Sequence, residues 1–179
     1  MGIYVGIISK SSFWGMDLLI LVTLGTNDKS FIRLIKKIEE LKIKGAIEQD
    51  IIVQAGYTKY SSEHMQIFDL IDMDNFQKLL QECSILITHG GVGTIVSGLQ
   101  NNKKVIAVPR LKKYGEHVND HQLQIIENFA ESGFLLPCYD MDDLEEAILK
   151  VESFEPKQYT SNTIHMVELV RNHIEQLVK

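Results

Sequence analysis

The residues best suited to bind an anionic ligand form the segment HGGVGT at positions 89–94. This segment follows an apolar run and precedes a helical pattern, so it connects a strand to a helix. Its three glycines let the chain turn tightly and point backbone N–H groups outward, and the helix N-terminus adds partial positive charge. A phosphate or diphosphate fits such a loop. The alternative is that the glycines only allow the helix to pack closely on the sheet.

A second polar segment, PRLKKYGEHVNDHQ at positions 109–122, also follows an apolar run. Asp120 and Gln122 can bind sugar hydroxyls, whereas Arg110 and the neighbouring lysines can contact phosphates. Asn119 and Asp120 are residue types that cap helices, and a helical pattern follows them. The alternative is that Asp120 serves only as a cap and that the lysines are simply solvated.

Three histidines and one glutamate are candidates for other chemistry. His117 and His121 are four residues apart, a spacing that can place two metal ligands on one helix face. Because only Glu116 or Asp120 could join them, the sequence favours hydrogen bonding, and we expect no metal and no cofactor. Glu116, His117 and His89 are the candidate catalytic residues for proton transfer.

A third motif, Gly25-Thr26, ends the apolar run at 18–24. In open α/β sheets ligands bind outside the carboxyl ends of the strands, where glycine lets the backbone approach a phosphate and threonine supplies a hydroxyl. A plain turn explains the same residues equally well. The glycine segments lack the Gly-Lys-Ser/Thr ending of a Walker A loop and the strict dinucleotide fingerprint, which argues against ATP hydrolysis and NAD binding.

A parallel sheet must position these motifs, because short apolar runs alternate with amphipathic stretches along the chain. Runs without polar alternation indicate strands that are covered on both faces. The sequence therefore predicts an α/β fold with a Rossmann-like parallel sheet of about six strands and helices on both faces. The predicted strands are 18–24, 51–54, 66–70, 85–88, 105–108 and 134–136. The predicted helices are 29–42, 75–82, 94–101, 119–131, 142–151 and 161–178.

Composition limits the function classes. The length of 179 residues is typical of one domain. The 18 basic and 24 acidic residues give a net charge of −6 without a basic block, which argues against nucleic-acid binding. The two cysteines, Cys83 and Cys138, are far apart, so we expect a reducing compartment and a cytoplasmic location.

The chain divides into three predicted parts. Residues 1–15 are too short to span a bilayer and lack the pattern of a signal peptide, so we expect an N-terminal appendage. We expect residues 16–155 to form one Rossmann-like domain, which the resemblance described next makes a nucleotide-sugar-binding domain. Residues 156–179 form a C-terminal amphipathic helix, whose apolar stripe packs either on its own domain or on a partner.

The motifs VTLGT (22–26), THGGVGT (88–94) and VPRLKKYGEHVNDHQ (108–122) together resemble a known family. They are similar to the UDP-sugar-binding C-terminal half of GT-B glycosyltransferases of the lipid II-forming GlcNAc transferase type. The resemblance covers about residues 17–137. It is strongest to the donor-binding subunits of bacterial capsule or exopolysaccharide β-1,4-galactosyltransferases and to the cytosolic subunit of the dolichol-linked GlcNAc transferase.

This resemblance implies how a UDP-sugar binds. The glycine motifs hold the diphosphate, the Asp-His-Gln segment contacts the sugar, and the backbone around Ile71 to Met73 contacts the uracil edge. Ser97 stands where many relatives place an acid for the ribose hydroxyls, which favours the bacterial subunits and leaves Glu116 as another ribose ligand. The candidate substrate-binding residues are Gly25, Thr26, Ile71, Met73, Gly90, Gly91, Val92, Gly93, Thr94, Arg110, Asn119, Asp120, His121 and Gln122.

The family further implies an inverting transfer of a hexose, here galactose, from a UDP-sugar to a polyprenyl-diphosphate-linked glycan in surface polysaccharide synthesis. A GT-B cleft needs two Rossmann-like domains and this sequence predicts one. We therefore expect a membrane-associated, acceptor-binding partner subunit that holds this protein at the inner face of the cell membrane. The first alternative is a non-catalytic nucleotide-sugar-binding module that stabilises or regulates such a transferase. A nucleotide-sugar epimerase is the second.

Overall fold

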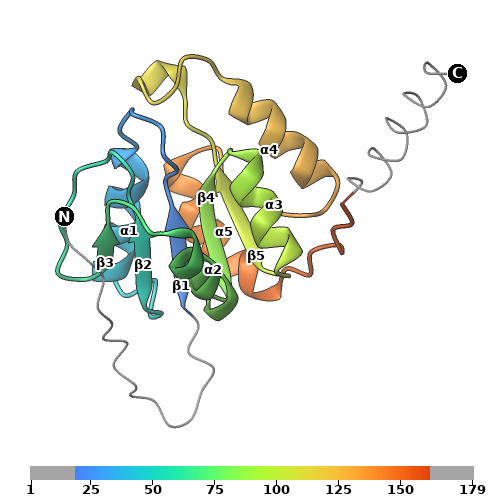
Figure 1. Cartoon of the computed structure of the whole chain (residues 1–179), viewed down its shortest axis with the longest axis horizontal. Coiled ribbons are helices and arrows are strands. Elements are labelled where there is room, and N and C mark those ends of the chain that lie inside the picture. Colours follow the sequence, from blue (N-terminus) through green and yellow to red (C-terminus); the bar gives the residue numbers. More distant parts are fainter. Residues whose placement is uncertain (1–18, 162–179) are drawn as a thin grey trace, which may run out of the picture.

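The computed structural model describes residues 19–161, which are built around a parallel sheet of six strands in the order β3-β2-β1-β4-β5-β6 (Figure 1). The strands are β1 (Ile20–Thr23), β2 (Ile51–Gln54), β3 (Gln66–Phe68), β4 (Ile85–His89), β5 (Lys104–Val108) and β6 (Leu136–Pro137). The helices are α1 (Ile32–Ile43), α2 (Met73–Glu82), α3 (Val92–Gln100), α4 (His121–Glu131) and α5 (Leu144–Ser153). The predicted fold class is confirmed. The predicted appendage at 1–15 and nearly all of the predicted helix at 161–178 lie outside the described residues.

Each face of the sheet has its own helices, because alternate residues of a strand point to opposite faces. Ile20 and Val22 of β1 belong to a buried core with residues of α1 and α5, whereas Leu21 belongs to a second core with residues of α2, α3 and α4. Figure 1 shows α2, α3 and α4 in front of the sheet and α5 behind it. Burial on both faces explains why the central strands have no polar alternation.

The order in which strands are added to the sheet changes side between β1 and β4. β1 pairs in parallel with β2 on one side and with β4 on the other, so that Ile20 lies opposite both Ile51 and Ile85. From β1 the chain builds outward to β3 and then returns to β4 on the opposite side. The carboxyl ends of β1 and β4 therefore flank a topological switch point, the usual place for a ligand in an open α/β sheet.

Several strands and helices begin or end at other residues than the sequence predicts. β1, β3 and β6 are shorter than predicted, and β6 lies at Leu136–Pro137 instead of 134–136. The third predicted helix begins at Val92 rather than at 94, and the fourth begins at His121 rather than at 119. A 3₁₀ turn, Lys112–Tyr114, interrupts the segment predicted as a loop, and another, Met141–Asp143, precedes α5.

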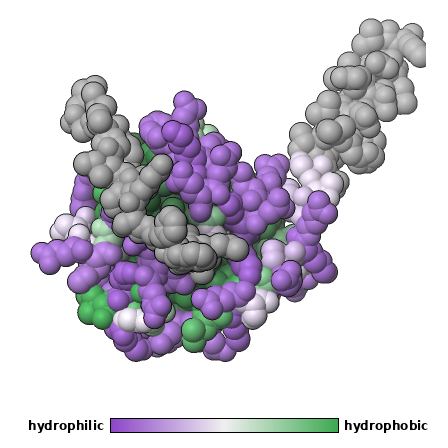
Figure 2. Space-filling view, turned by 90° about the horizontal axis from the view of Figure 1, so that it is seen from below, coloured by the Kyte–Doolittle hydropathy of each residue, from purple (hydrophilic) through white to green (hydrophobic). Residues whose placement is uncertain are grey.

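The surface at the amino ends of the strands is mostly hydrophilic. Figure 2 shows this face with small, separate hydrophobic patches. Among residues 19–161 no helix has the length and apolarity needed to cross a membrane.

Candidate functional site

Three loops meet at the carboxyl edge of the sheet, namely residues 24–31 after β1, 90–91 after β4 and 109–120 after β5. Figure 1 shows the loop after β5 rising above the sheet on the side of the loop after β1. A hydrogen bond of 2.6 Å from Arg110 Nη2 to the Leu24 carbonyl joins these two loops. The structure therefore brings together the three motifs that the sequence singled out.

The N-terminus of α3 presents backbone N–H groups that have no acceptor in the described chain. The first bond of the helix runs from the Ile95 N–H to the Gly91 carbonyl at 3.2 Å, and Gly91 has no side chain that could cap the helix. Within residues 19–161, the N–H groups of Val92, Gly93 and Thr94 accordingly donate to no partner. A Cβ at Gly93 would meet no heavy atom within 4 Å, so the space beside it is open. Such a helix end is suited to bind an anion.

The His89 imidazole lies between two of the predicted site glycines. A Cβ at Gly25 would lie 2.5 Å from His89 Cε1, and a Cβ at Gly91 would overlap His89 Nε2. These glycines are therefore needed to accommodate the ring, whatever ligand they also approach. Burial, followed by the positive charge of Arg110, lowers the pKa of His89 from 6.5 to about 4, so the ring is neutral at pH 7.

Gln122 joins the loop after β4 to the loop after β5. Its side-chain oxygen accepts from the Gly90 N–H at 3.1 Å and from the Arg110 N–H at 2.9 Å, and the residue is buried. Because two N–H donors converge on this atom, it is the oxygen, and the side-chain NH₂ group remains to donate elsewhere. A Cβ at Gly90 would lie 2.6 Å from Gln122 Cβ, so the close approach of the loops requires glycine there.

Arg110 points inward rather than toward a ligand. It is 1% exposed, and its Nη2 and Nη1 atoms donate to the carbonyls of Leu24 at 2.6 Å and Lys29 at 2.7 Å. Its guanidinium stacks over the Phe31 ring at 4.9 Å, and burial lowers its pKa to about 10. In this geometry Arg110 holds the loop that carries Gly25, and its guanidinium is not presented to a phosphate.

Glu116, a candidate for proton transfer or ribose binding, is 3% exposed with both carboxylate oxygens occupied. Oε1 accepts from Arg33 Nε at 2.8 Å, and Oε2 accepts from the Leu111 N–H at 3.0 Å. Arg33 Nη2 also donates to the Pro109 carbonyl at 2.6 Å. Sequence reasoning missed Arg33, because the charge pattern of α1 gives no signal that separates it from the solvated lysines beside it.

The remaining candidates in this loop lie near its surface. Asp120 is exposed and its Oδ1 accepts from the Lys112 N–H at 2.7 Å, which ties the start of α4 to the 3₁₀ turn. Asn119 Oδ1 accepts from the His121 N–H at 3.2 Å. Asp120 occupies the N-cap position of α4, yet its side chain makes no capping bond. His121 is exposed and His117 is partly exposed, so both imidazoles can be reached from solvent at this end of the site, beside the exposed Lys112 and Lys113.

Ile71 and Met73 follow β3, farther along the same edge. Ile71 is partly buried against the second core, and Met73, the first residue of α2, is 70% exposed. Asp72 caps α2 by accepting from the Asn75 N–H at 2.9 Å, so α2 has a side-chain cap, which α3 lacks. In the strand order β2 lies between β3 and β1, so Ile71 and Met73 follow a strand that is not adjacent to β1 or β4.

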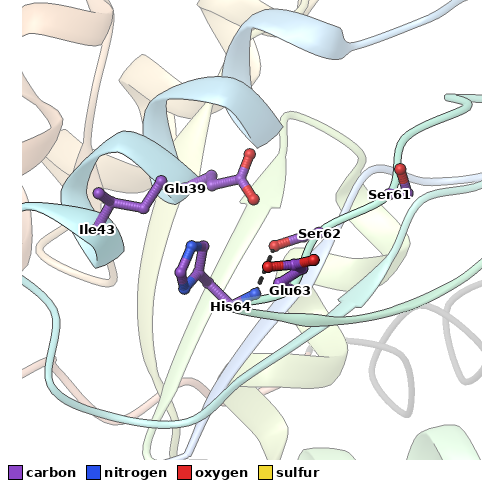
Figure 3. A pocket seen from close by; sticks show the side chains of 6 residues that line it. All are labelled: Glu39, Ile43, Ser61, Ser62, Glu63 and His64. Atoms are coloured by element: carbon purple, nitrogen blue, oxygen red, sulfur yellow. Dashed lines mark hydrogen bonds between the residues drawn. The ribbon is translucent and has the colours of Figure 1, made fainter.

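A hollow in the surface lies away from the carboxyl edge of the sheet. It has a volume of about 460 Å³ and is lined by residues of α1 and of the segment before β3, namely Glu39, Ile43, Ser61, Ser62, Glu63 and His64 (Figure 3). Hydrogen bonds from Ser62 and then from Tyr60 lower the pKa of Glu39. The hollow contains none of the predicted site residues. Nowhere in residues 19–161 are three or more His, Cys, Asp or Glu side chains placed to hold a metal ion.

The sequence matches the family model of the glycosyltransferase family 28 C-terminal domain over residues 19–177. The UDP-N-acetylglucosamine transferase subunit ALG13 of Candida glabrata is 29% identical over 143 residues, which are 78% of this chain and 64% of that protein. The protein of the same name from Candida albicans is 21% identical over 123 residues, 68% of this chain and 40% of that protein. This chain thus spans less than two thirds of each relative.

Solved structures show the same fold. The glycotransferase of kitacinnamycin superposes with a TM-score of 0.59 at 18% identity, covering 83% of this chain and 39% of that one. The solution structure of ALG13 gives a TM-score of 0.55 at 18% identity, over 86% of this chain and 94% of that one. MurG from Acinetobacter baumannii gives 0.51 at 18% identity, over 75% and 41% of the two chains. At such identities the likeness concerns the fold alone.

Proposed function

Because the chain belongs to the family of glycosyltransferase family 28 C-terminal domains, we propose that it binds the UDP-sugar donor of an inverting glycosyltransferase. The observation that carries this proposal is the open N-terminus of α3 beside the switch point between β1 and β4. A diphosphate there would accept hydrogen bonds from the N–H groups of Val92, Gly93 and Thr94, with Gly25 and Thr26 across from it.

The other parts of the donor would extend in opposite directions along the sheet edge. The uracil would lie toward Ile71 and Met73 after β3, which is three strand spacings from β4, roughly 14 Å, a span suited to an extended nucleotide diphosphate. The sugar would lie toward α4, where the Asp120 carboxylate and the free NH₂ group of Gln122 offer an acceptor and a donor for its hydroxyls. His121 is exposed on the same turn.

The proposed reaction is displacement of UDP by an acceptor hydroxyl with inversion at the anomeric carbon. The bond from that carbon to the diphosphate oxygen breaks, its electron pair leaves with UDP, and the acceptor oxygen forms the new bond as its proton passes to a base. In this proposal the free N–H groups at the N-terminus of α3 stabilise the charge that develops on the departing diphosphate, and no metal is required. His89, with a pKa of about 4, is a weak base and serves better as a neutral polar wall. With Glu116 buried in an ion pair, the base is His117 or a group on the partner.

A membrane-associated, acceptor-binding partner supplies the other wall of the cleft in this proposal. It is supported by the relatives' name, which describes a transferase subunit. The partner would hold this protein on the cytoplasmic face of the membrane, beside a polyprenyl-diphosphate-linked glycan. For the sugar, the motifs suggest UDP-galactose, as in capsule synthesis, and the relatives' name suggests UDP-N-acetylglucosamine.

The test is transfer of radiolabelled sugar from UDP-galactose, UDP-N-acetylglucosamine and UDP-glucose to membrane glycolipid. Three samples are compared. The first holds the full chain alone, and the second, the combined sample, holds the full chain with membranes that carry both the candidate partner and the acceptor. The third is the combined sample prepared without acceptor. Transfer only in the combined sample with acceptor, lost in Asp120→Ala, supports the proposal and identifies the donor. UDP binding without transfer, in membranes shown to hold acceptor and partner, supports the non-catalytic module instead. Interconversion of the sugar without acceptor indicates an epimerase.

A further inference from the structure

Arg33 lies on α1 and connects this helix to the loop after β5, which carries the proposed sugar contacts. It lies outside the three motifs that the sequence singled out. We propose that Arg33 is a positioning residue for recognition of the donor's sugar and that it acts through Glu116 on Asp120. This inference rests on the proposed function, because Asp120 is there assigned to the sugar.

The guanidinium of Arg33 is fixed from several directions. Its Nε atom lies 2.8 Å from Glu116 Oε1, in an ion pair whose side chains are 16% and 4% exposed. Its Nη2 atom donates to the Pro109 carbonyl at 2.6 Å. The rings of Phe31 and Tyr114 flank it, with centroids at 5.2 and 4.8 Å. A planar fork with separate donors and two stacking faces can make all these contacts at once, which a lysine cannot.

Glu116 passes this constraint to the tip of the loop. Its Oε2 atom accepts from the Leu111 N–H at 3.0 Å, and its own N–H donates to the Leu111 carbonyl at 3.2 Å, so Leu111 and Glu116 close the loop between them. The next residue, Lys112, donates its N–H to Asp120 Oδ1 at 2.7 Å. The path from Arg33 to the Asp120 carboxylate thus consists of three hydrogen bonds and the backbone step from Leu111 to Lys112.

The same geometry separates the sugar from the diphosphate. The donors proposed for the diphosphate lie at the N-terminus of α3 and at Gly25 and Thr26, and Arg33 makes no hydrogen bond to any of them. Its contact with the loop after β1 is with the Phe31 ring, at the other end of that loop. Loss of Arg33 should therefore let the Asp120 carboxylate move while leaving the diphosphate site in place. A residue that only stabilised the fold would instead affect UDP and UDP-sugar binding alike.

The test compares affinities for UDP, UDP-galactose and UDP-N-acetylglucosamine by calorimetry in the full chain. Because Arg33→Met alone leaves a buried carboxylate unpaired and can prevent folding, the double variant Arg33→Met/Glu116→Gln is measured beside it. Arg33→Lys is the conservative variant. Lys37→Met is the matched control, because Lys37 lies one turn later on α1, is 17% exposed, and pairs only with Glu40 and Asp142, at 3.3 and 3.9 Å, in the described chain.

We expect the double variant to keep UDP affinity within about twofold of wild type and to lose about tenfold or more in affinity for the preferred UDP-sugar relative to UDP. Arg33→Lys should recover part of that ratio, and Lys37→Met should keep it. Hydrogen exchange of the Leu111 and Lys112 N–H groups should be faster in the double variant than in the wild type and in Lys37→Met. A wild-type chain that binds no uridine nucleotide refutes the proposed function. A chain that binds UDP-sugars no better than UDP, or a double variant with the wild-type ratio, overturns the inference on Arg33.

Discussion

Replacing Gly93 by alanine should stabilise the fold and weaken ligand binding. Gly93 is the second residue of α3, its φ is not positive, and a Cβ there would meet no heavy atom within 4 Å. Alanine is favoured over glycine in a helix by about 0.5–1 kcal/mol. For a chain of this size that gain raises the midpoint of thermal unfolding by about 1–4 °C. We expect Gly93→Ala to show this increase in calorimetry.

The same methyl group should obstruct the proposed diphosphate. A Cβ in a helix tilts toward the helix N-terminus, which here is the side of the free N–H groups. Each hydrogen bond from such a group to a charged phosphate contributes about 1.5–3 kcal/mol, so the loss of one lowers affinity roughly 10- to 100-fold. Titration calorimetry with UDP should therefore give a Kd for Gly93→Ala that is higher than the wild-type value by that factor.

Gly91→Ala is the contrasting variant, two positions away. Its Cβ would overlap the Nε2 atom of His89, so the ring must leave its place between Gly25 and Gly91. Overpacking of this kind costs about 1–3 kcal/mol, and the thermal midpoint should fall rather than rise. If Gly93→Ala also lowers the midpoint, or if it binds UDP as tightly as the wild type, the N-terminus of α3 is not an open diphosphate site and the reasoning is wrong.

Three further experiments test the scaffold of the site. Gln122→Ala leaves the Gly90 and Arg110 N–H groups without their acceptor, and urea denaturation should show that the free energy of unfolding falls by about 2–5 kcal/mol. Gln122→Glu keeps an acceptor and should lose less stability, so equal losses in the two variants would contradict the bridging role of Gln122. The His89 ring should titrate near pH 4 by NMR, as its lowered pKa requires. Because the unfolded chain takes up this proton near pH 6.5, the stability that depends on His89 should fall by at most about 3 kcal/mol between pH 6.5 and 4, a loss absent in His89→Gln. Gly98→Ala places a Cβ 2.6 Å from a β4 side chain and should cost about 1–3 kcal/mol; an unchanged urea midpoint would show that α3 shifts freely.

The architecture could be predicted from the sequence because its signals are local. Uninterrupted apolar runs marked the buried strands, and the 3.6-residue period of α1 marked the face that buries Leu34, Ile35, Ile38 and Leu41. The glycine segment between β4 and α3 indicated an exposed helix N-terminus, since both the glycines and the start of the helix are neighbours in the chain. Strand ends were less certain, because the last ladder bond depends on the neighbouring strand.

Only the tertiary structure decided which polar side chains of the site face a ligand. The sequence places Arg110 and Glu116 in a polar loop, a pattern that is compatible with exposed side chains as well as with buried ones. Arg110 is buried because the carbonyl of Leu24, 86 positions away, meets its guanidinium, and Glu116 is buried because Arg33, 83 positions away, neutralises its charge. Burial of a charge is stable only beside a partner, and no local pattern reveals a partner that the order of the strands brings close. The sequence by itself determined where along the chain the loops of the site lie. The packing of α1 against the loop after β5 determined which polar side chains of these loops are buried and which can face a ligand.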